Sequence, residues 1–497
     1  MALVRQSNGS DWSLNDTVIR PTYNTEKELF YHHRSRFLIP FKSSAYTLAK
    51  RLKQIFGVDR AIGLTILGRC FTLPAGVVTI MLISRLMSPI EQGYYYSIWS
   101  LWALQTVFEL GFSFVILQVA AHERASLSIR ADGVLQGDIR SISRLAGLLR
   151  TVQRWYLVAA LIMVTILLVW GFRFFNMRPS VGVHWQWPWI LTVLAAGLMF
   201  QIGPTISFLE GCGYVSDVAG QRLIQSVASY LVGWIAIISR HGLYAPGCMV
   251  AAECVTGFAF FYRHRRLLLQ LLRERSIGYD ISWRNEILPF QWRVALTWLT
   301  AYIPNILFAP LLFSIRGPVE AGKMGLSMNI ALSLGFISLS WMTTKAAPFG
   351  SLVARGQELE LDRLFFRTLR QSFVLVGIGA AAIFFGAQII DWYLPSIGNR
   401  MLPQAAFFFL LLTTVCNHLV QSESLYMRSH KQEPFMYQSL AIALLLAACS
   451  WFGAKSAGSL GLAMAYFICS GVIASVSGTI IFRRKRRVWL SGYEVQT

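Results

Sequence analysis

Charged side chains are scarce in this sequence. Asp, Glu, Lys and Arg make up 14% of its 497 residues, whereas about 25% is usual in soluble domains. Apolar residues reach 55%, with 33 Phe, 18 Tyr and 16 Trp. This balance excludes an ordinary soluble domain and indicates a protein that crosses a membrane many times.

Motifs that would carry chemistry are also lacking. The seven cysteines contain no CxxC pair, so we expect neither a disulfide framework nor a zinc site. GPVEAGKM (317–324) approaches a phosphate loop, but Met324 replaces the hydroxyl residue that would bind Mg²⁺. AHERA (121–125) lacks the second His of HExxH, and GxSxG does not occur. We therefore predict that the chain is not an enzyme and needs no metal and no cofactor.

Long apolar runs, in contrast, are abundant. A helix needs about 20 mostly apolar residues to cross a hydrocarbon core roughly 30 Å thick. The length of the runs favours helices over the short alternating strands of a barrel. We predict an all-α polytopic membrane protein with transmembrane helices near 61–86, 93–120, 155–176, 188–210, 222–239, 243–262, 289–315, 322–347, 372–393, 403–426, 434–453 and 459–482.

Acidic residues are few beside basic ones, at 24 against 45. Most of the basic residues fall in the N-terminal segment, in every second loop and at the C-terminus, with dense clusters at 263–266 and 483–487. The positive-inside rule therefore predicts that both termini are cytoplasmic. We interpret the net charge of +21 as a topology signal and a contact with the lipid surface, and we expect no nucleic-acid partner.

A short motif occurs twice. SPIEQGYYYS (88–97) returns as GPVEAGKMGL (317–326), so that Pro-x-Glu-x-Gly recurs in the second half of the chain. Both copies fall in a predicted outer hairpin between the first two helices of a half. Two halves of six helices start and end on the same side, so a pseudo-two-fold axis along the membrane normal should relate them. We predict a polar cytoplasmic N-terminal arm, two six-helix bundles and a cytoplasmic tail, at 1–57, 58–273, 274–487 and 488–497.

Several stretches together resemble a known family. They are RLMSPIEQGYYYSIWSL (85–101), FELGFSFVILQ (108–118), LEGCGYVSDVAGQR (209–222), PFGSLVARGQE (348–358) and MRSHKQEPFMY (427–437). In this order the sequence resembles bacterial polysaccharide flippases of the multidrug/oligosaccharidyl-lipid/polysaccharide exporter superfamily. It departs from them in its long N-terminal arm and in Met324, which leaves Tyr95 without a counterpart.

The resemblance implies a flippase of the bacterial inner membrane. Its substrate would be a polyprenyl-pyrophosphate-linked oligosaccharide, moved from the cytoplasmic to the outer leaflet by alternating access. Sugar hydroxyls and diphosphate charges cannot enter hydrocarbon without a large desolvation cost, whereas the polyprenyl tail can stay in lipid. The expected partners are the bilayer, a glycosyltransferase or polymerase, and a coupling proton or sodium ion. Two alternatives stay open: a cation-coupled multidrug antiporter of the same fold, and a membrane polymerase or ligase acting on lipid-linked sugar.

Basic residues within the apolar runs are candidates for binding the diphosphate. An Arg near a helix centre costs about 2.5–3.5 kcal/mol on insertion scales, so its presence calls for a reason. We predict substrate-binding roles for Arg69, Arg293 and Lys345, because guanidinium and ammonium groups bind phosphate oxygens. The alternative for Arg69 is a side chain that snorkels to the cytoplasmic surface.

Acidic residues within the runs are candidates for ion coupling. Glu253, Glu109 and Glu423 lie in predicted helices six, two and ten, respectively. Each could exchange a proton or bind sodium, or pair with one of the cations. Glu91 and Glu320, in the two hairpins, are expected to cap helices or bind the hairpin backbone.

The charge pattern predicts which loops face outward. A cysteine introduced at position 180 or 398, on a background without reactive cysteines, should react with a membrane-impermeant maleimide from outside. Cysteines at 270 and 490 should react only after the membrane is opened. Strong labelling of position 270 in intact cells would overturn the topology.

Overall fold

The computed structural model describes residues 60–494 with short gaps. The positions outside the description are 1–59, 110, 125–126, 131–133, 179, 181, 275–306, 431, 433 and 495–497. The predicted arm 1–57 and the predicted boundary at 274, which adjoins the gap at 275–306, therefore cannot be compared with the structure. The predicted tail from 488 onward starts inside a helix that continues to Glu494.

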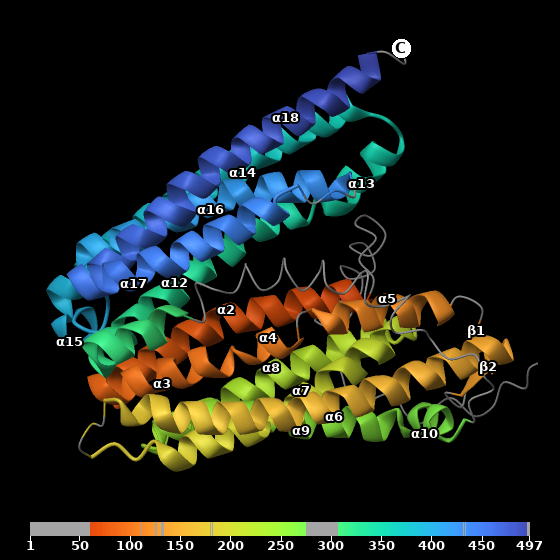
Figure 1. Ribbon diagram of the computed structural model, residues 1–497, viewed down its shortest axis with the longest axis horizontal. Coiled ribbons are helices and arrows are strands. Elements are labelled where there is room, and N and C mark those ends of the chain that lie inside the picture. Colours follow the sequence, from red (N-terminus) through yellow and green to blue (C-terminus); the bar gives the residue numbers. More distant parts are fainter. Residues whose placement is uncertain are drawn as a thin grey trace, which may run out of the picture. The chain divides into compact units, whose positions relative to one another are not determined.

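The first half of the described chain is a bundle of helices (Figure 1). An antiparallel pair of short strands, β1 (Leu127–Ile129) and β2 (Leu135–Gly137), joins two of them. The helices are α2 (Arg60–Leu86), α3 (Pro89–Trp102), α4 (Gln105–Glu109), α5 (Phe112–Arg124), α6 (Ile139–Asn176), α7 (Gln186–Gly211), α8 (Val215–Ile238), α9 (Ala245–Arg263) and α10 (Arg265–Arg273).

The second half forms another helical bundle. A short apolar helix, Leu307–Arg316, precedes it. It contains α12 (Pro318–Thr343), α13 (Ala346–Ala354), α14 (Glu358–Tyr393), α15 (Pro395–Gly398), α16 (Gln404–Ser429), α17 (Met436–Tyr466) and α18 (Ala474–Glu494), with a π-helical turn at Phe467–Ile473. α17 is kinked at Ala457 and Gly458, where φ is 61° at the glycine.

The hydrophobic pattern predicted the membrane class and the helix positions. In the described residues, nine helices are long and apolar enough to span a membrane, or ten if the bent α3–α5 segment counts as one. Every predicted run other than the seventh overlaps a described helix, and most of the seventh (289–315) lies outside the description. Large apolar side chains such as Val169, Ile235 and Phe452 are exposed, as lipid-facing residues are. The all-α polytopic fold is confirmed.

The second predicted span is not one straight helix. The prediction placed a continuous helix at 93–120, whereas the structure bends by 43° between 89–109 and 112–124. Gly111, with φ of 71°, lies at the bend. The conformation is one that glycine adopts without a steric penalty. Apolar composition could not reveal this break, because the run stays apolar through it.

The two hairpins begin their helices differently. At α3, the Ser88 hydroxyl accepts a hydrogen bond from the Glu91 N–H at 3.1 Å, and the Glu91 carboxylate accepts one from the Ser88 N–H at 2.7 Å. This capping box confirms the expected role of Glu91. α12 starts after Gly317, which has no capping side chain, and Glu320 lies 3.8 Å from the Lys323 ammonium instead. The capping role expected of Glu320 is therefore not found.

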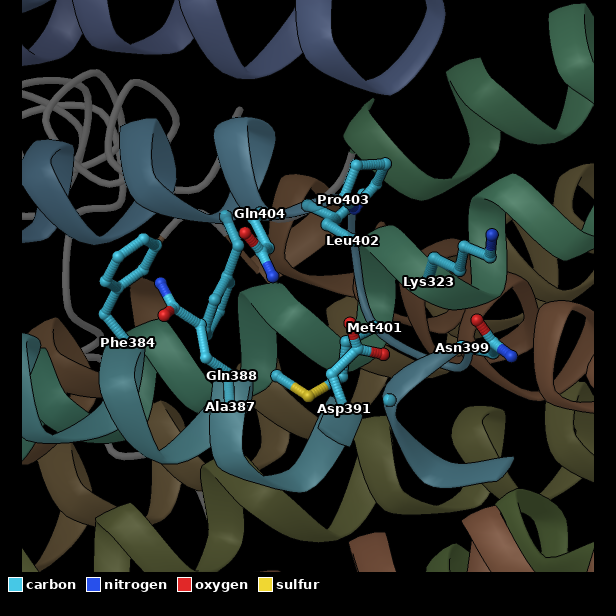
Figure 2. A pocket seen from close by; sticks show the side chains of 12 residues that line it. Lys323, Phe384, Ala387, Gln388, Asp391, Asn399, Met401, Leu402, Pro403 and Gln404 are labelled. Carbon is cyan, nitrogen blue, oxygen red and sulfur yellow. The ribbon is translucent and has the colours of Figure 1, made fainter. Parts of the chain in front are cut away.

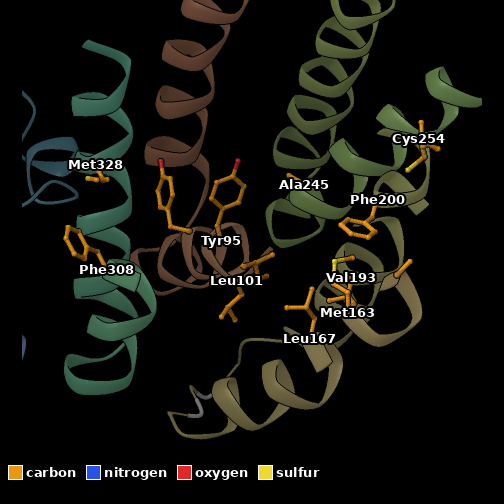
Figure 3. Close-up of a cluster of buried hydrophobic side chains, with 14 of the residues drawn as sticks. Tyr95, Leu101, Met163, Leu167, Val193, Phe200, Ala245, Cys254, Phe308 and Met328 are labelled. Carbon is orange, nitrogen blue, oxygen red and sulfur yellow. The ribbon is translucent and has the colours of Figure 1, made fainter. Parts of the chain in front are cut away.

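A buried apolar core extends through both bundles (Figure 3). Tyr94 packs on Phe175 with ring centroids 5.5 Å apart, and on Phe313 of the helix Leu307–Arg316 at 5.1 Å. Phe175 also contacts Trp189 at 5.7 Å. These rings connect α3, α6 and α7 with the start of the second half.

Gly171 is required by the packing of α6 against α7. A Cβ atom there would overlap the indole ring of Trp189, which is fully buried. We expect Gly171→Ala to destabilise the protein by about 1–3 kcal/mol through overpacking, seen as a lower thermal midpoint in detergent. Gly203→Ala in α7 is the control, since nothing lies within 4 Å of its Cβ. Equal midpoints for the two variants would contradict this packing.

Candidate functional site

The two copies of Pro-x-Glu-x-Gly meet face to face. α3 packs on α12, and we call this contact the bundle interface. A Cβ on Gly93 would overlap the carbonyl of Pro318, and one on Gly322 would lie 2.8 Å from the Gly93 nitrogen. Both glycines are therefore needed for the backbones to approach so closely. The motif found in the sequence is the point where the two halves touch.

Hydrogen bonds reinforce the bundle interface. Gln92, which is 1% exposed, donates from Nε2 to the carbonyl oxygens of Gly322 at 3.1 Å and Arg400 at 3.2 Å. The Arg400 guanidinium donates to Gln92 Oε1 at 3.4 Å. Burial lowers the pKa of Arg400 from its ordinary value, and the negative charge of Glu91 acts in the opposite direction. Arg400 stays charged, because an Arg pKa lies far above neutrality.

A second set of bonds lies beside the first. Arg178 donates to the carbonyl oxygens of Ser314 at 3.2 Å and Ile315 at 3.1 Å. Its own carbonyl accepts a hydrogen bond from the Tyr94 hydroxyl at 3.1 Å. The loop after α6 is thereby tied both to α3 and to the end of the helix Leu307–Arg316.

A pocket of about 160 Å³ adjoins the bundle interface, and we call it the apex pocket. Its walls come from both halves of the chain. They are Tyr96, Trp99, Ser100, Ala103, Phe308, Ala309, Met324, Gly325, Met328, Asn329 and Leu332. Aromatic faces with a few hydroxyl and amide groups are typical of binding sites for organic ligands. Met324, the departure from the family pattern, is fully buried in this wall.

Glu109 lies at the end of α4, at the bend of the second span. Its side chain is half-buried. Helix breaks within a membrane expose backbone polar groups and are tolerated where they line protein or water rather than lipid. Discontinuous spans also form the binding sites of many transporters. The break therefore places a carboxylate on the same span as the α3 residues of the apex pocket.

Arg69 is exposed on α2. Heptad spacing puts it on the same helix face as Gly76 and Ile83, and Ile83 is 1% exposed. The opposite face carries apolar side chains such as Leu67 and Val78, which are exposed as lipid-facing residues are. Arg69 therefore lies away from the exposed apolar face of α2, on a side where nothing lies within 4 Å of a Cβ on Gly76.

The two other predicted cations are Lys345 and Arg293. Lys345 is half-buried at the break between α12 and α13, where its backbone N–H donates to the Met342 carbonyl at 3.0 Å. Arg293 lies outside the described residues. The side chains of Lys345 and Arg69 share no contact partner in the described part of the chain, so the predicted common diphosphate site stays a prediction.

The predicted acidic residues lie in separate places. Glu253 of α9 accepts a hydrogen bond from the buried Ser229 hydroxyl of α8 at 3.0 Å, inside the first bundle. Glu423 of α16, 2% exposed, accepts one from Thr479 of α18 at 2.9 Å, inside the second bundle. One carboxylate oxygen of Glu423 is buried and has no hydrogen-bond partner within the described ranges of the chain. These contacts suit a proton or cation acceptor in each bundle.

Sequence reasoning missed the polar neighbours of Glu423 on α16. His418, 3% exposed, lies 2.9 Å from the Ser372 hydroxyl through Nε2, and its Nδ1 has no partner among the described residues. Asn417 donates to the Tyr466 hydroxyl at 3.1 Å. The cluster of polar letters in VCNHLVQSES (415–424) was the available signal. A search restricted to charged residues does not identify this cluster, because His418, Asn417 and Ser372 are not counted as charged.

Two ion pairs near the end of the second bundle were also missed. Arg486 of α18 binds the Asp362 carboxylate of α14, and Tyr426 donates to the same carboxylate at 2.9 Å. His430 lies 3.0 Å from Glu358 and stacks on Trp489 with ring centroids 3.9 Å apart. These pairs fix the basic end of α18 to the bundle. Among the described residues, no group of His, Cys, Asp and Glu could hold a metal ion.

The fold and the site together define a polytopic membrane protein whose two helical bundles meet beside a pocket. That fold is shared with transporters of the MOP (multidrug/oligosaccharidyl-lipid/polysaccharide exporter) superfamily. The lipid II flippase MurJ, in an inward closed conformation, aligns with a TM-score of 0.62 at 12% identity, covering 87% of this chain and 92% of that one.

Two structures of MATE family multidrug transporters of this superfamily also align. An inward-facing one has a TM-score of 0.58 at 13% identity, over 83% of this chain and 99% of that one. An outward-facing one has a TM-score of 0.52 at 14% identity, over 87% and 96%. No protein-family model and no curated sequence matches the chain. The likeness confirms the predicted fold.

The bundle interface should shield the apex pocket from outside. A cysteine at Ser100, on a background without reactive cysteines, should react slowly with an impermeant maleimide in intact cells. Adding Gly93→Leu should force α3 and α12 apart and raise the labelling rate several-fold. Gly76→Leu in α2 is the control, because nothing lies within 4 Å of its Cβ. Fast labelling before any glycine is changed would show that the interface does not close this side.

Proposed function

We propose that this protein is a flippase that carries polyprenyl-pyrophosphate-linked oligosaccharide across the bacterial inner membrane. The observation that carries the proposal is Arg69, an exposed cation within the apolar helix α2 and away from its exposed apolar face, in a fold shared with the lipid II flippase MurJ. A cation at that depth is costly unless it binds an anion or reaches water. The diphosphate of a lipid-linked sugar is such an anion.

Alternating access is the mechanism that this arrangement supports. Backbone contact at Gly93 and Gly322 closes the bundles at the end that charge predicts to be outer. We infer an inward-facing state that would receive substrate from the cytoplasm, because this contact closes the outer end.

Each part of the substrate would meet a suitable environment. The polyprenyl tail can stay in lipid, because it has no polar group to desolvate. The diphosphate would bind Arg69, with Lys345 and Arg293 as further cations. The sugars would face the aromatic and polar walls of the apex pocket, which is far too small for a whole oligosaccharide at about 160 Å³. The bundles must therefore separate around the sugar during passage.

Energy for the cycle would come from a coupled ion. Glu253, Glu423 and Glu109 are the candidates for carrying a proton or sodium. Glu253 and Glu423 each bind a hydroxyl within a single bundle. An ion bound there would change the packing of α8 on α9 or of α16 on α18. Glu109 would act differently, since it lies at the bend of the second span.

Multidrug antiport is the second candidate function. The observation that favours it is Glu109, a half-buried carboxylate on the same span as the α3 residues of the apex pocket, which could attract a cationic drug. The two functions predict different phenotypes for cells that lack the protein. Cells lacking the protein would become sensitive to cationic dyes if it exports drugs. They would retain lipid-linked sugar in the inner leaflet if it is a flippase.

Substitutions at Arg69 test the proposed diphosphate contact. Loss of a charge-assisted hydrogen bond costs about 1.5–3 kcal/mol, so Arg69→Ala should weaken substrate binding roughly ten- to a hundredfold. Arg69→Lys should keep part of the activity, and Arg69→Glu should be worse than Arg69→Ala because it repels the diphosphate. The measurement is appearance of lipid-linked sugar in the outer leaflet, for variants matched in membrane abundance.

The control for this series is Arg85, an exposed arginine at the other end of the same helix. Arg85→Ala should leave transport near the wild-type level. Equal transport by wild type and all three Arg69 variants would make Arg69 a bystander that only reaches the surface.

A further inference from the structure

A second pocket lies within the second bundle, and we call it the side pocket (Figure 2). Its volume is about 250 Å³. Its walls come from α12, α14, the segment after α15 and the start of α16. They are Lys323, Phe384, Ala387, Gln388, Asp391, Gly398, Asn399, Met401, Leu402, Pro403, Gln404 and Phe407. By the charge pattern this end of the bundle faces outward.

The polar groups of the side pocket have hydrogen-bonding capacity to spare. No hydrogen bond links the side chains of Gln388, Asp391, Asn399 or Gln404 to another residue in the described part of the chain. Lys323 lies 3.8 Å from Glu320 and keeps two further donors. Carboxamides both donate and accept hydrogen bonds, as hydroxyl groups do. The pocket therefore offers paired donors and acceptors rather than one kind alone.

The charges of the side pocket select against ionic ligands. The Lys323 ammonium is already paired with Glu320, and Asp391 adds a carboxylate elsewhere in the pocket wall, so the wall carries charges of both signs. Opposite charges in one site favour a neutral ligand with dipolar groups over either ion. A metal ion is not favoured, because a single carboxylate is a poor ligand set.

The apolar walls favour a ligand with one flat apolar face. The aromatic ring of Phe407 is 2% exposed and forms part of the wall with Phe384, Met401 and Leu402. Aromatic rings pack on the CH faces of pyranose sugars and leave the hydroxyls free for polar partners. At about 250 Å³, the pocket is smaller than the roughly 300–1,000 Å³ usual for drug-sized ligands. It suits one sugar ring and excludes an oligosaccharide.

We propose that the side pocket is a carbohydrate subsite that binds one neutral pyranose unit at the predicted outer end of the second bundle. This proposal rests on the proposed flippase function. The subsite would hold one sugar of the lipid-linked oligosaccharide as the substrate leaves. Asn399, Gln388 and Gln404 provide hydrogen bonds to hydroxyls, and the half-buried ring of Phe384 packs against the sugar face.

The segment 399–403 links this subsite to the bundle interface. It contributes Asn399 and Met401 to the pocket, while the residue between them, Arg400, binds Gln92 on α3. The backbone N–H of Leu402 donates to the Ser327 hydroxyl of α12 at 3.0 Å. A sugar in the side pocket would therefore contact the same segment that holds the two bundles together.

Binding of free monosaccharides tests the subsite without any transport. The full chain, purified in nanodiscs, would be examined by saturation-transfer difference NMR with glucose, galactose, mannose and N-acetylglucosamine, and with glucuronate and glucosamine as charged probes. We expect at least one neutral sugar to bind. Gln388→Leu and Gln404→Leu should each weaken its binding between about two- and tenfold, the loss of one hydrogen bond. Gln136→Leu, an exposed glutamine on β2, should not.

Three results would overturn the subsite: no neutral sugar binds, both Leu variants bind like wild type, or the charged probes bind as well as the neutral ones. Outer-leaflet appearance of lipid-linked sugar is measured in parallel for the same variants. Transport by wild type without sugar binding refutes the subsite alone. Sugar binding without transport of lipid-linked sugar refutes the flippase and leaves a sugar-binding pocket.

Discussion

The close approach of the backbone at Gly93 and Gly322 is the contact on which the arrangement of the two bundles depends. Lipid tails are as apolar as Leu, so hydrophobic burial does not drive helices together inside a bilayer. Small residues and hydrogen bonds do, and the bundle interface uses both: two glycines in contact, and Gln92 donating to carbonyl groups of Gly322 and Arg400. The apex pocket and the segment beside the side pocket both adjoin this contact.

The two copies of the repeated motif have diverged around that shared contact. The first starts its helix with a Ser88–Glu91 capping box, and the span that follows bends at Gly111 beside Glu109. The second starts after Gly317 and continues as one unbroken helix, α12, to Thr343. The bent α3–α5 span and the unbroken helix α12 therefore have different shapes on the two sides of the bundle interface. A proposed site for an asymmetric cargo, with a charged head and a neutral sugar, fits such inequality.

The ionisable groups are divided between two environments. Arg69 is exposed, so it can reach a charged substrate without losing all of its hydration. Glu423 and His418 are nearly fully buried and bind hydroxyl groups inside the second bundle. Buried groups of this kind affect helix packing when their protonation or ion occupancy changes. The proposed mechanism assigns substrate contact to the first environment and energy coupling to the second.

The sequence by itself determined that the chain lies in a membrane and where the described helices fall, and it picked out the repeated motif; that the two copies touch was decided by the tertiary structure. The membrane class and the helix positions follow from local composition, so the apolar runs were sufficient to predict them. The repeat could be recognised because Pro-x-Glu-x-Gly occurs twice. The sequence did not reveal the bend at Gly111, because the run stays apolar through it, nor the polar set around His418, which is scattered along one helix. The side pocket was decided by tertiary structure alone. Lys323, Gln388 and Gln404 come from three separate segments, and only the packing of α12, α14 and α16 brings them together.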